Sequence, residues 1–176
     1  MPNVSSIDFE NETEIYKLQK NLFNIKKFRC SKQDYADYIK KDAIIDQQRS
    51  IGQTWLLVYK QREVIGYVTL AMAELHKNQH RKLNVFPHSY IPALLVGQLA
   101  THQDYEHLGV GKTMIQWVIS QGIQYSKNIG CRLIVLNPEK DVIKWYKEKL
   151  GFEHIPHRRT QDVMFYDLAW YKGNNN

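Results

Sequence analysis

The stretch that decides the fold reads Leu99-Ala-Thr-His-Gln-Asp-Tyr-Glu-His-Leu-Gly-Val-Gly-Lys-Thr113. Residues 94–100 are mostly apolar and predict a buried strand, and apolar positions such as Val110 and Met114 predict a helix after the loop. Where a strand passes through a glycine-containing loop into a helix, backbone N–H groups and the positive end of the helix dipole point outward together. The stretch therefore predicts a phosphate-binding loop at the start of a helix.

The glycines of this loop distinguish it from two better-known nucleotide motifs. A phosphate can approach the backbone closely at Gly109 and Gly111, and Lys112 adds a cation beside them. The loop is not a Walker motif, because no glycine lies five positions before Gly111, and it lacks the three-glycine dinucleotide fingerprint. Glycines also serve packing and turns, so the loop needs a second motif to support it.

Along the whole chain, the sequence indicates two helices, three strands, a helix, a strand, a helix and one or two further strands, in that order. Asn11, and Ser31 with Asp34, are typical of helix starts, and two apolar segments around a polar turn indicate an antiparallel hairpin. The order predicts an α/β (α+β) fold, with a mixed, mostly antiparallel sheet flanked by helices. The expected elements are helices over 11–22, 31–48, 110–128 and 141–150, strands over 54–59, 64–72, 94–100, 132–136 and 163–168, and a basic loop over 76–90.

Length and composition indicate one globular domain. The 176 residues are 43% hydrophobic and contain no repeat or linker, so we expect a single domain over 1–172 and a disordered tail over 173–176. The longest apolar run, 91–97, is far shorter than the roughly 20 residues that cross a bilayer, so no membrane is expected. The first eight residues lack the features of a signal peptide, and two cysteines fit a reducing compartment, so we expect a cytoplasmic location.

The charge favours an anionic partner without naming it. Lys and Arg number 24 against 18 Asp and Glu, a net charge of +6, yet the first 50 residues hold nine cations and eight acids. No segment is therefore a polybasic tail. The 76–90 loop with Arg158 and Arg159 is a candidate RNA-binding face, and an ordinary solvated surface is the alternative. The histidines lack the spacing of a zinc site, so no metal is expected.

Several motifs together resemble the acetyl-CoA-binding core of the GNAT family of N-acetyltransferases. They are the stretch Gln98-Leu-Ala-Thr101, the loop Tyr105-Glu-His-Leu-Gly-Val-Gly111, Asn137, and Trp145-Tyr-Lys-Glu-Lys-Leu-Gly-Phe152. An upstream set also resembles the subgroup of tRNA-acetylating toxins, and the resemblance covers roughly residues 28–170. This set consists of Phe28-Arg-Cys30, Asp42-Ala43, Gln47-Gln-Arg49, Thr54 and Val64-Ile-Gly-Tyr67.

The resemblance implies a splayed sheet whose opened strand holds the cofactor. Residues 99–101 would pair with the pantetheine arm, residues 106–113 would wrap the pyrophosphate, and Asn137 would lie where the arm leaves the sheet. Where the family usually has Gln or Arg, this chain has Glu106, so only its backbone can serve the phosphates. The implied cofactor-binding residues are Leu99, Ala100, Thr101, Glu106, His107, Leu108, Gly109, Val110, Gly111, Lys112, Thr113 and Asn137.

The resemblance also implies a catalytic acid, Tyr146, close to the sulfur of acetyl-CoA. A phenol near pKa 10 can protonate a departing thiolate whose thiol has a pKa near 8.5, although the transfer is mildly uphill. The spacing from Tyr146 to Gly151 is one residue longer than the family pattern. The alternative for Tyr146 is an aromatic residue packed in the core.

The kind of amine that is acetylated is inferred from the lack of a general base in this part of the sequence. Residues 91–100 contain no Asp or Glu, and His102 with Thr101 offers at most a weak, water-mediated base. At pH 7 about 14% of an α-amino group is neutral, against about 0.04% of a lysine amine, so an α-amine hardly needs a base.

These observations predict an acetyl-CoA-dependent N-acetyltransferase in which a primary amine of unknown identity attacks directly. A toxin that acetylates aminoacyl-tRNA α-amino groups is the first alternative, which makes tRNA a candidate partner. A non-catalytic CoA-binding module is the second. A homodimer is a candidate assembly.

Overall fold

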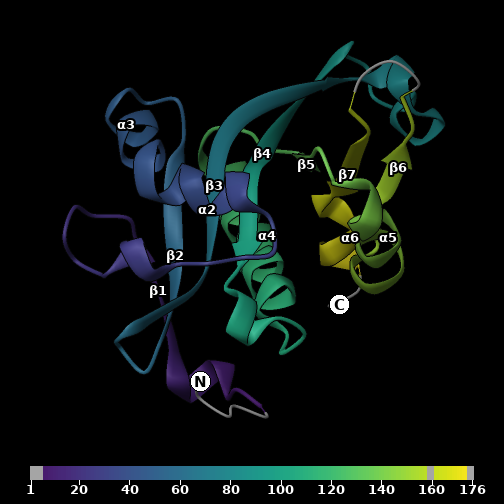
Figure 1. The fold of residues 1–176 in the computed structure, drawn as a ribbon. Coiled ribbons are helices and arrows are strands. Elements are labelled where there is room, and N and C mark those ends of the chain that lie inside the picture. The colour runs from purple at the N-terminus through teal and green to yellow at the C-terminus, as the bar shows by residue number, and fades with distance from the viewer. Residues whose placement is uncertain (1–5, 158–160, 174–176) are drawn as a thin grey trace. The chain divides into compact units, whose positions relative to one another are not determined.

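The computed structural model describes residues 6–157 and 161–173, and in this part of the chain seven strands form one sheet in the order β1-β2-β3-β4-β5-β7-β6 (Figure 1). β4 pairs with β5 in parallel, whereas β1 with β2, β2 with β3, β5 with β7 and β6 with β7 pair antiparallel. This confirms the predicted mixed, mostly antiparallel sheet with flanking helices. The strands are β1 (Thr13–Lys17), β2 (Gln53–Tyr59), β3 (Glu63–His76), β4 (Tyr90–Thr101), β5 (Leu133–Leu136), β6 (Glu153–Ile155) and β7 (Val163–Asp167).

Helices of very different length connect these strands, and the longest of those described is α4, which the sequence predicts closely. The α-helices are α1 (Phe9–Glu12), α2 (Gln33–Lys41), α3 (Ala43–Gln48), α4 (Val110–Asn128), α5 (Ile143–Leu150) and α6 (Leu168–Gly173). Short 3₁₀ turns are η1 (Ile25–Lys27), η2 (Lys77–Gln79), η3 (Arg81–Leu83), η4 (Gln103–Tyr105) and η5 (Lys140–Val142). None of the described helices is long and apolar enough to cross a bilayer.

The chain divides into two compact units. The first comprises Met1–Ala71 and Gly97–Gln116, and the second comprises Met72–Val96 and Trp117–Asn176. A single domain over 1–172 stays a prediction. Of the predicted tail, Gly173 closes α6, and residues 174–176 lie outside the described residues.

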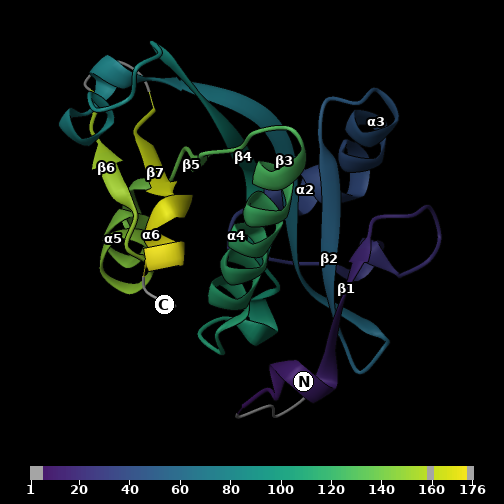
Figure 2. The same ribbon diagram turned by 180° about the vertical axis from the view of Figure 1, so that it is seen from behind.

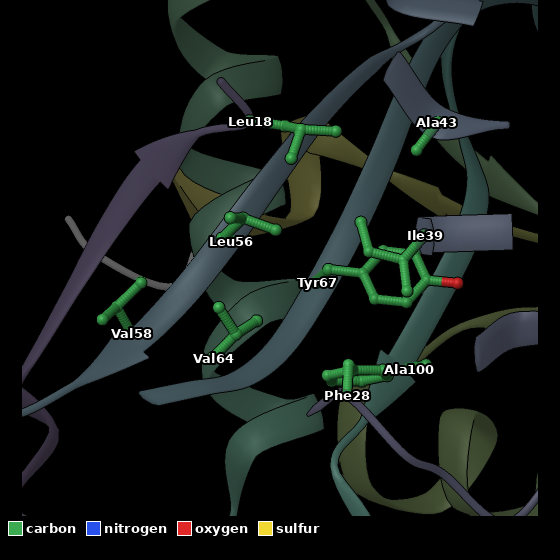
Figure 3. Packing of buried hydrophobic residues seen from close by; sticks show 9 residues of the cluster. All are labelled: Leu18, Phe28, Ile39, Ala43, Leu56, Val58, Val64, Tyr67 and Ala100. Carbon is green, nitrogen blue, oxygen red and sulfur yellow. The ribbon is translucent and has the colours of Figure 1, made fainter. Parts of the chain in front are cut away.

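The core of the first unit is built around Tyr67, which is fully buried (Figure 3). The Phe28 ring meets the Tyr67 ring edge-on at 5.5 Å, and the Tyr67 hydroxyl donates a hydrogen bond of 2.8 Å to the Tyr35 carbonyl. A buried tyrosine needs such an acceptor, because an unpaired hydroxyl is costly in an apolar core. Its neighbours in this cluster are Leu18, Ile39, Ala43, Leu56, Val58, Val64 and Ala100.

In β3 a β-bulge lies next to Gly66, against which α4 packs. Leu57 pairs with Gly66 and Val58 pairs with Val64, so Ile65 is an extra residue in β3. A Cβ on Gly66 would lie only 2.7 Å from Val110 Cγ1 and 3.1 Å from Met114 Sδ. The first turns of α4 can therefore pack here only because residue 66 has no side chain.

The second unit has its own apolar core, and a salt bridge connects Arg132, just before β5, with Asp167 at the end of β7. Leu83 and Phe165 are buried with residues of β4, β5 and β6. The Arg132 guanidinium binds Asp167 through two hydrogen bonds, of 2.7 and 3.0 Å, and lies 4.8 Å from the centre of the Phe86 ring. Bidentate geometry makes this pair stronger than a simple surface ion pair.

Two N-terminal predictions are wrong in part. The predicted helix over 11–22 is absent, because the chain leaves α1 at Glu12 and continues as β1, which pairs with β2. Pairing along a whole strand outweighs the local helix signal at Asn11. The predicted helix over 31–48 is two helices that meet at Asp42. Gln47 fixes the second of them, α3, through its side-chain hydrogen bonds with the Leu18 carbonyl and the Thr54 amide.

Other differences concern lengths and short elements. The predicted hairpin is confirmed, with β3 running on to His76, and its turn places Lys60 and Gln61 in the left-handed region, at φ 48° and 57°. The predicted loop over 76–90 contains two 3₁₀ turns and is held by Leu83, which is 1% exposed. The strand β6 and the helix α6 are additional short elements. The predicted strand over 163–168 ends at Asp167, because Leu168 begins α6.

Candidate functional site

The candidate site begins at the C-terminal end of β4. β4 pairs with β5 only over Ala93 to Val96, opposite Leu133 to Leu136, where β5 ends. β4 itself runs on to Thr101, five residues past that last pair. The last five residues of β4 therefore have no partner in β5. Within this extension Ala100 is buried, and Leu99 and Thr101 are half-buried.

The loop that follows β4 turns through two left-handed residues into α4. His107 has φ 65° and Gly109 has φ 95°. The Gly109 carbonyl accepts a 3.0 Å hydrogen bond from the Thr113 N–H, so Gly109 is the first residue of the helical hydrogen-bond pattern. The N–H groups of the next residues lie at the positive end of the helix dipole, and the first turn contains no acidic residue. This geometry fits the phosphates of a CoA molecule.

Gly109 cannot be replaced without strain. Its φ is one that side chains rarely adopt, and a Cβ there would lie 3.3 Å from Cε2 of Phe9 in α1. The N-terminal segment thus packs against the loop, and nothing in the sequence indicated this contact. Thr113 is half-buried and Lys112 is exposed at the start of the helix.

A buried tyrosine fastens the loop to β3. Tyr105 is 0% exposed, and its hydroxyl donates a 2.7 Å hydrogen bond to Oε2 of Glu63. Burial, and then the hydrogen bond to Glu63, raise the pKa of the Tyr105 phenol far above its usual value. Tyr105 is therefore a neutral donor that anchors the loop. Glu63 was not recognised from the sequence, because it lies 42 positions away.

His102, the weak base candidate, has a structural role in its surroundings. It is 4% exposed, its backbone N–H donates 2.8 Å to the Ile65 carbonyl, and Phe28 meets its ring at 5.5 Å. Nδ1 accepts a 3.2 Å hydrogen bond from the Asp104 N–H, so the neutral ring carries its proton on Nε2. Nδ1 is thus engaged by the backbone of the loop, and Asp104 Oδ2 lies 4.0 Å from it.

Cys131 is buried and Cys30 is half-buried, and neither has the surroundings of a nucleophile. Burial raises the pKa of the Cys30 thiol, which donates a 3.0 Å hydrogen bond to the Lys32 carbonyl. Burial likewise raises the pKa of Cys131. A thiol with a raised pKa is a poor nucleophile at neutral pH. The described residues include no group of three or more His, Cys, Asp or Glu side chains that could hold a metal ion.

The remaining predicted site residues, Asn137 and Tyr146, belong to the second unit. Asn137 directly follows β5 and is exposed, and its Nδ2 donates a 3.1 Å hydrogen bond to the Asp162 carbonyl. Tyr146 lies in α5, is 6% exposed, and its ring packs edge-on against Trp145 and Phe152. Gly151, at φ 73°, ends the helix, and its N–H binds the Tyr146 carbonyl. The first unit thus contains all predicted cofactor residues between 99 and 113, and the second contains the other two.

Comparison with known families settles which fold this is. The model of the acetyltransferase (GNAT) family matches residues 13–152, which is most of the chain. The chain belongs to the GNAT family. This GNAT protein is therefore an acetyl-CoA-dependent N-acetyltransferase, which confirms the predicted enzyme class, acetyl donor and acetyl transfer to an amine.

Solved structures share the fold over nearly their whole length. AtaT complexed with acetyl-methionyl-tRNAfMet superimposes with a TM-score of 0.84 at 16% identity, covering 94% of this chain and 100% of AtaT. A tyrosine-to-phenylalanine mutant of KacT gives 0.83 at 18% identity, covering 93% and 99%. AtaTR bound with acetyl-CoA gives 0.77 at 16% identity, covering 94% and 99%. At these identities the matches establish the common fold of this GNAT chain and those proteins.

Proposed function

We propose that this GNAT acetyltransferase acetylates the α-amino group of an aminoacyl-tRNA, as a toxin-type enzyme. The observation that carries the proposal is the fold shared end to end with AtaT in complex with acetyl-methionyl-tRNAfMet. Neither chain has a large segment without a counterpart in the other. The same architecture thus frames an acetyl-transfer site in a protein that holds an acetylated aminoacyl-tRNA.

The cofactor would lie along the end of β4 and across the start of α4. Backbone groups of residues 99–101 would pair with the pantetheine arm, and the loop over 106–113 would hold the pyrophosphate. The left-handed Gly109 and the acid-free first turn of α4 support this placement. Asn137, just after β5, is the further cofactor residue that the family resemblance implies. Glu106 would serve only through its backbone.

Transfer would proceed by direct attack. The amine nitrogen bonds to the thioester carbonyl carbon, the C–S bond breaks, and the thiolate takes a proton, for which Tyr146 is the proposed donor. The new amide nitrogen releases one proton to water and Tyr146 regains one from water, so the products are the amide and the free thiol. A backbone N–H near Leu99 or Ala100 would stabilise the oxyanion. Solved variants of both AtaT and KacT replace a tyrosine with phenylalanine, which supports a tyrosine as the residue of interest. In this chain the stretch 145–152, which resembles the family's motif, has a tyrosine at position 146.

The choice of an α-amine follows from the lack of a base. Residues 91–100 contain no carboxylate, and His102 is 4% exposed, with its Nδ1 engaged by the Asp104 N–H. An α-amino group is about 14% neutral at pH 7 and can attack unaided, whereas a lysine amine is about 0.04% neutral.

The proposal is tested by comparing acceptors with radiolabelled acetyl-CoA. We expect aminoacyl-tRNA to be acetylated at a far higher kcat/KM than a lysyl peptide whose N-terminus is blocked. A preference for the lysine would overturn the proposal. Binding of acetyl-CoA without acetylation of any amine would instead indicate a non-catalytic CoA-binding module.

Tyr146→Phe tests the acid in the same assay. Loss of a general acid typically lowers turnover about 10²- to 10⁴-fold, whereas the affinity for acetyl-CoA should stay the same because the ring is kept. Turnover equal to that of the wild type would show that Tyr146 is not the acid.

A further inference from the structure

The excess positive charge of this protein is concentrated in one segment. Residues 17–32 contain six cations and no carboxylate, and we call them the cationic segment. When these six are taken from the 24 Lys and Arg residues, eighteen remain, which equals the number of Asp and Glu residues. The segment therefore accounts for the whole net charge of +6. Its cations are Lys17, Lys20, Lys26, Lys27, Arg29 and Lys32.

Most of these charges are exposed and not neutralised. Lys17, Lys20, Lys26 and Lys27 are exposed, and among residues 6–157 and 161–173 none of the four has an ion-pair partner. Arg29 lies 3.6 Å from Asp104, yet 61% of its side chain remains exposed. Exposed cations without partners keep their full attraction for a polyanion.

The backbone beneath these charges is fixed rather than loose. Leu18 and Phe28 are each 1% exposed and belong to the core of the first unit. The Leu18 N–H donates to the Thr54 carbonyl at 2.8 Å, and the Leu18 carbonyl accepts from the Gln47 side chain at 2.8 Å. Figures 1 and 2 show this stretch as the open loop between β1 and α2. The cations are thus presented by a segment anchored near both ends.

The segment reaches the end of β4. The Arg29 carbonyl accepts a 2.8 Å hydrogen bond from the Gln103 N–H, and the Phe28 ring packs on His102. Residues 102 and 103 directly follow the strand end that we assign to the cofactor. A polyanion on the cationic segment would therefore lie beside the end of β4, where residues 99–101 are the proposed cofactor residues, within the same compact unit.

We propose that the cationic segment binds the phosphate backbone of the tRNA whose aminoacyl end is acetylated. This inference rests on the proposed function and adds the surface that holds the substrate. Six cations along 16 residues suit a ligand with many regularly spaced phosphates. Contacts of this kind give affinity and register without reading sequence.

The rival surface, the basic loop over 76–90, has less free charge. Lys82 pairs with Glu153 at 2.6 Å, and Lys77 donates a 3.2 Å hydrogen bond to the Phe86 carbonyl. Of the three cations in this loop, Lys77 and Lys82 are thus engaged, and Arg81 is exposed. The other part of that predicted face, Arg158 and Arg159, lies outside the described residues.

The test compares two variants of equal charge. Lys26→Gln/Lys27→Gln removes two exposed cations from the cationic segment, and Lys127→Gln/Lys149→Gln removes two exposed cations from α4 and α5. The binding constant K for tRNA that carries no amino acid is measured without acetyl-CoA at several salt concentrations. Each lost phosphate contact should reduce the slope of log K against log salt by about 0.7 to 0.9. We expect a reduction of about 1.5 for the first variant and none for the control.

Acetylation distinguishes this proposal from the proposed function. The first variant should lose roughly tenfold in kcat/KM for aminoacyl-tRNA and keep its kcat/KM for methionine amide, a small α-amine, because phosphate contacts act only on the RNA. If the wild type acetylates aminoacyl-tRNA but both variants match it, the segment is not the RNA surface. The wild type could instead acetylate no aminoacyl-tRNA while the first variant alone reduces the slope of log K against log salt. That result would support the cationic segment as an RNA-binding surface and would overturn aminoacyl-tRNA as the substrate.

A third measurement addresses the other polyanion that a basic surface can bind. Vesicles of phosphatidylcholine and phosphatidylglycerol are offered to the wild type and to the Lys26→Gln/Lys27→Gln variant. Segment-dependent binding to these vesicles, with no binding of tRNA, would overturn the RNA assignment in favour of a membrane surface.

Discussion

At the scale of single residues, Gly109 controls how closely an anion can approach the start of α4. We predict that Gly109→Ala weakens acetyl-CoA binding about tenfold or more, because the φ of 95° and the contact with Phe9 force the loop to shift. Isothermal titration calorimetry measures the dissociation constant. Gly130→Ala is the matched control, since Gly130 has φ 73° and open space around it. It should cost about 1 kcal/mol of stability and leave acetyl-CoA affinity unchanged; equal affinity losses in both variants would contradict the assigned role.

The burial of the Tyr105 phenol, together with its hydrogen bond to Glu63, makes the stability of the protein depend on pH. An unfolded tyrosine ionises near pH 10, and folded Tyr105 ionises at higher pH because its pKa is raised. The stability from this group is therefore complete below pH 10 and is lost progressively above it. We predict that the free energy of unfolding in urea falls less between pH 9 and pH 11 in Tyr105→Phe than in the wild type. Tyr67, whose pKa is also raised by burial, keeps part of the dependence in the variant.

Residue by residue, the sequence predicted the site where the pattern is local. The helix start at Val110 follows from the glycine pair and the apolar period, whereas the left-handed φ of Gly109 is seen only in the structure. Phe9 and Glu63 were missed, because each reaches the loop from a distant part of the chain. Such contacts depend on strand pairing, which no short window of sequence contains.

At the scale of elements, the lack of a side chain at Gly66 lets the β2–β3 hairpin pack closely against α4. We predict that Gly66→Ala lowers the free energy of unfolding by about 1–3 kcal/mol, because the added methyl group would overlap Val110 and Met114. Thermal or urea unfolding measures the loss. Gly97→Ala, in β4, is the comparison, since its Cβ would lie 3.7 Å from the nearest atom, the Thr69 carbonyl oxygen. A similar loss in both variants would mean that backbone freedom, rather than packing on α4, explains the effect.

The elements also show where sequence patterns stop being informative. α4 is long and periodic, so its position was predicted to within a residue or two. Thr13 to Lys17 is a strand only because β2 lies beside it, and the helix signal at Asn11 belongs to the four-residue α1. The three-residue β6 is too short to show a period of its own.

At the scale of the whole molecule, the proposed reaction has a cellular outcome. We predict that expression of the chain in bacteria arrests growth, because acetylated aminoacyl-tRNA cannot donate its α-amine to a growing peptide. Tyr146→Phe should abolish the arrest while the protein accumulates to the same level. Growth curves after induction, with immunoblots of the protein, measure both. Arrest that persists in the Tyr146→Phe variant would show that toxicity does not depend on this tyrosine.

The placement of charge in residues 17–32 also bears on how the protein behaves during purification. Because the other 160 residues carry no net charge, the cationic segment should determine how strongly the protein is retained on a cation-exchange column. The molecules would adsorb in a common orientation, with the cationic segment against the resin. Chemical modification of Lys26 or Lys27 should therefore produce an early-eluting peak, whereas the same modification at Lys127 or Lys149 should shift elution much less.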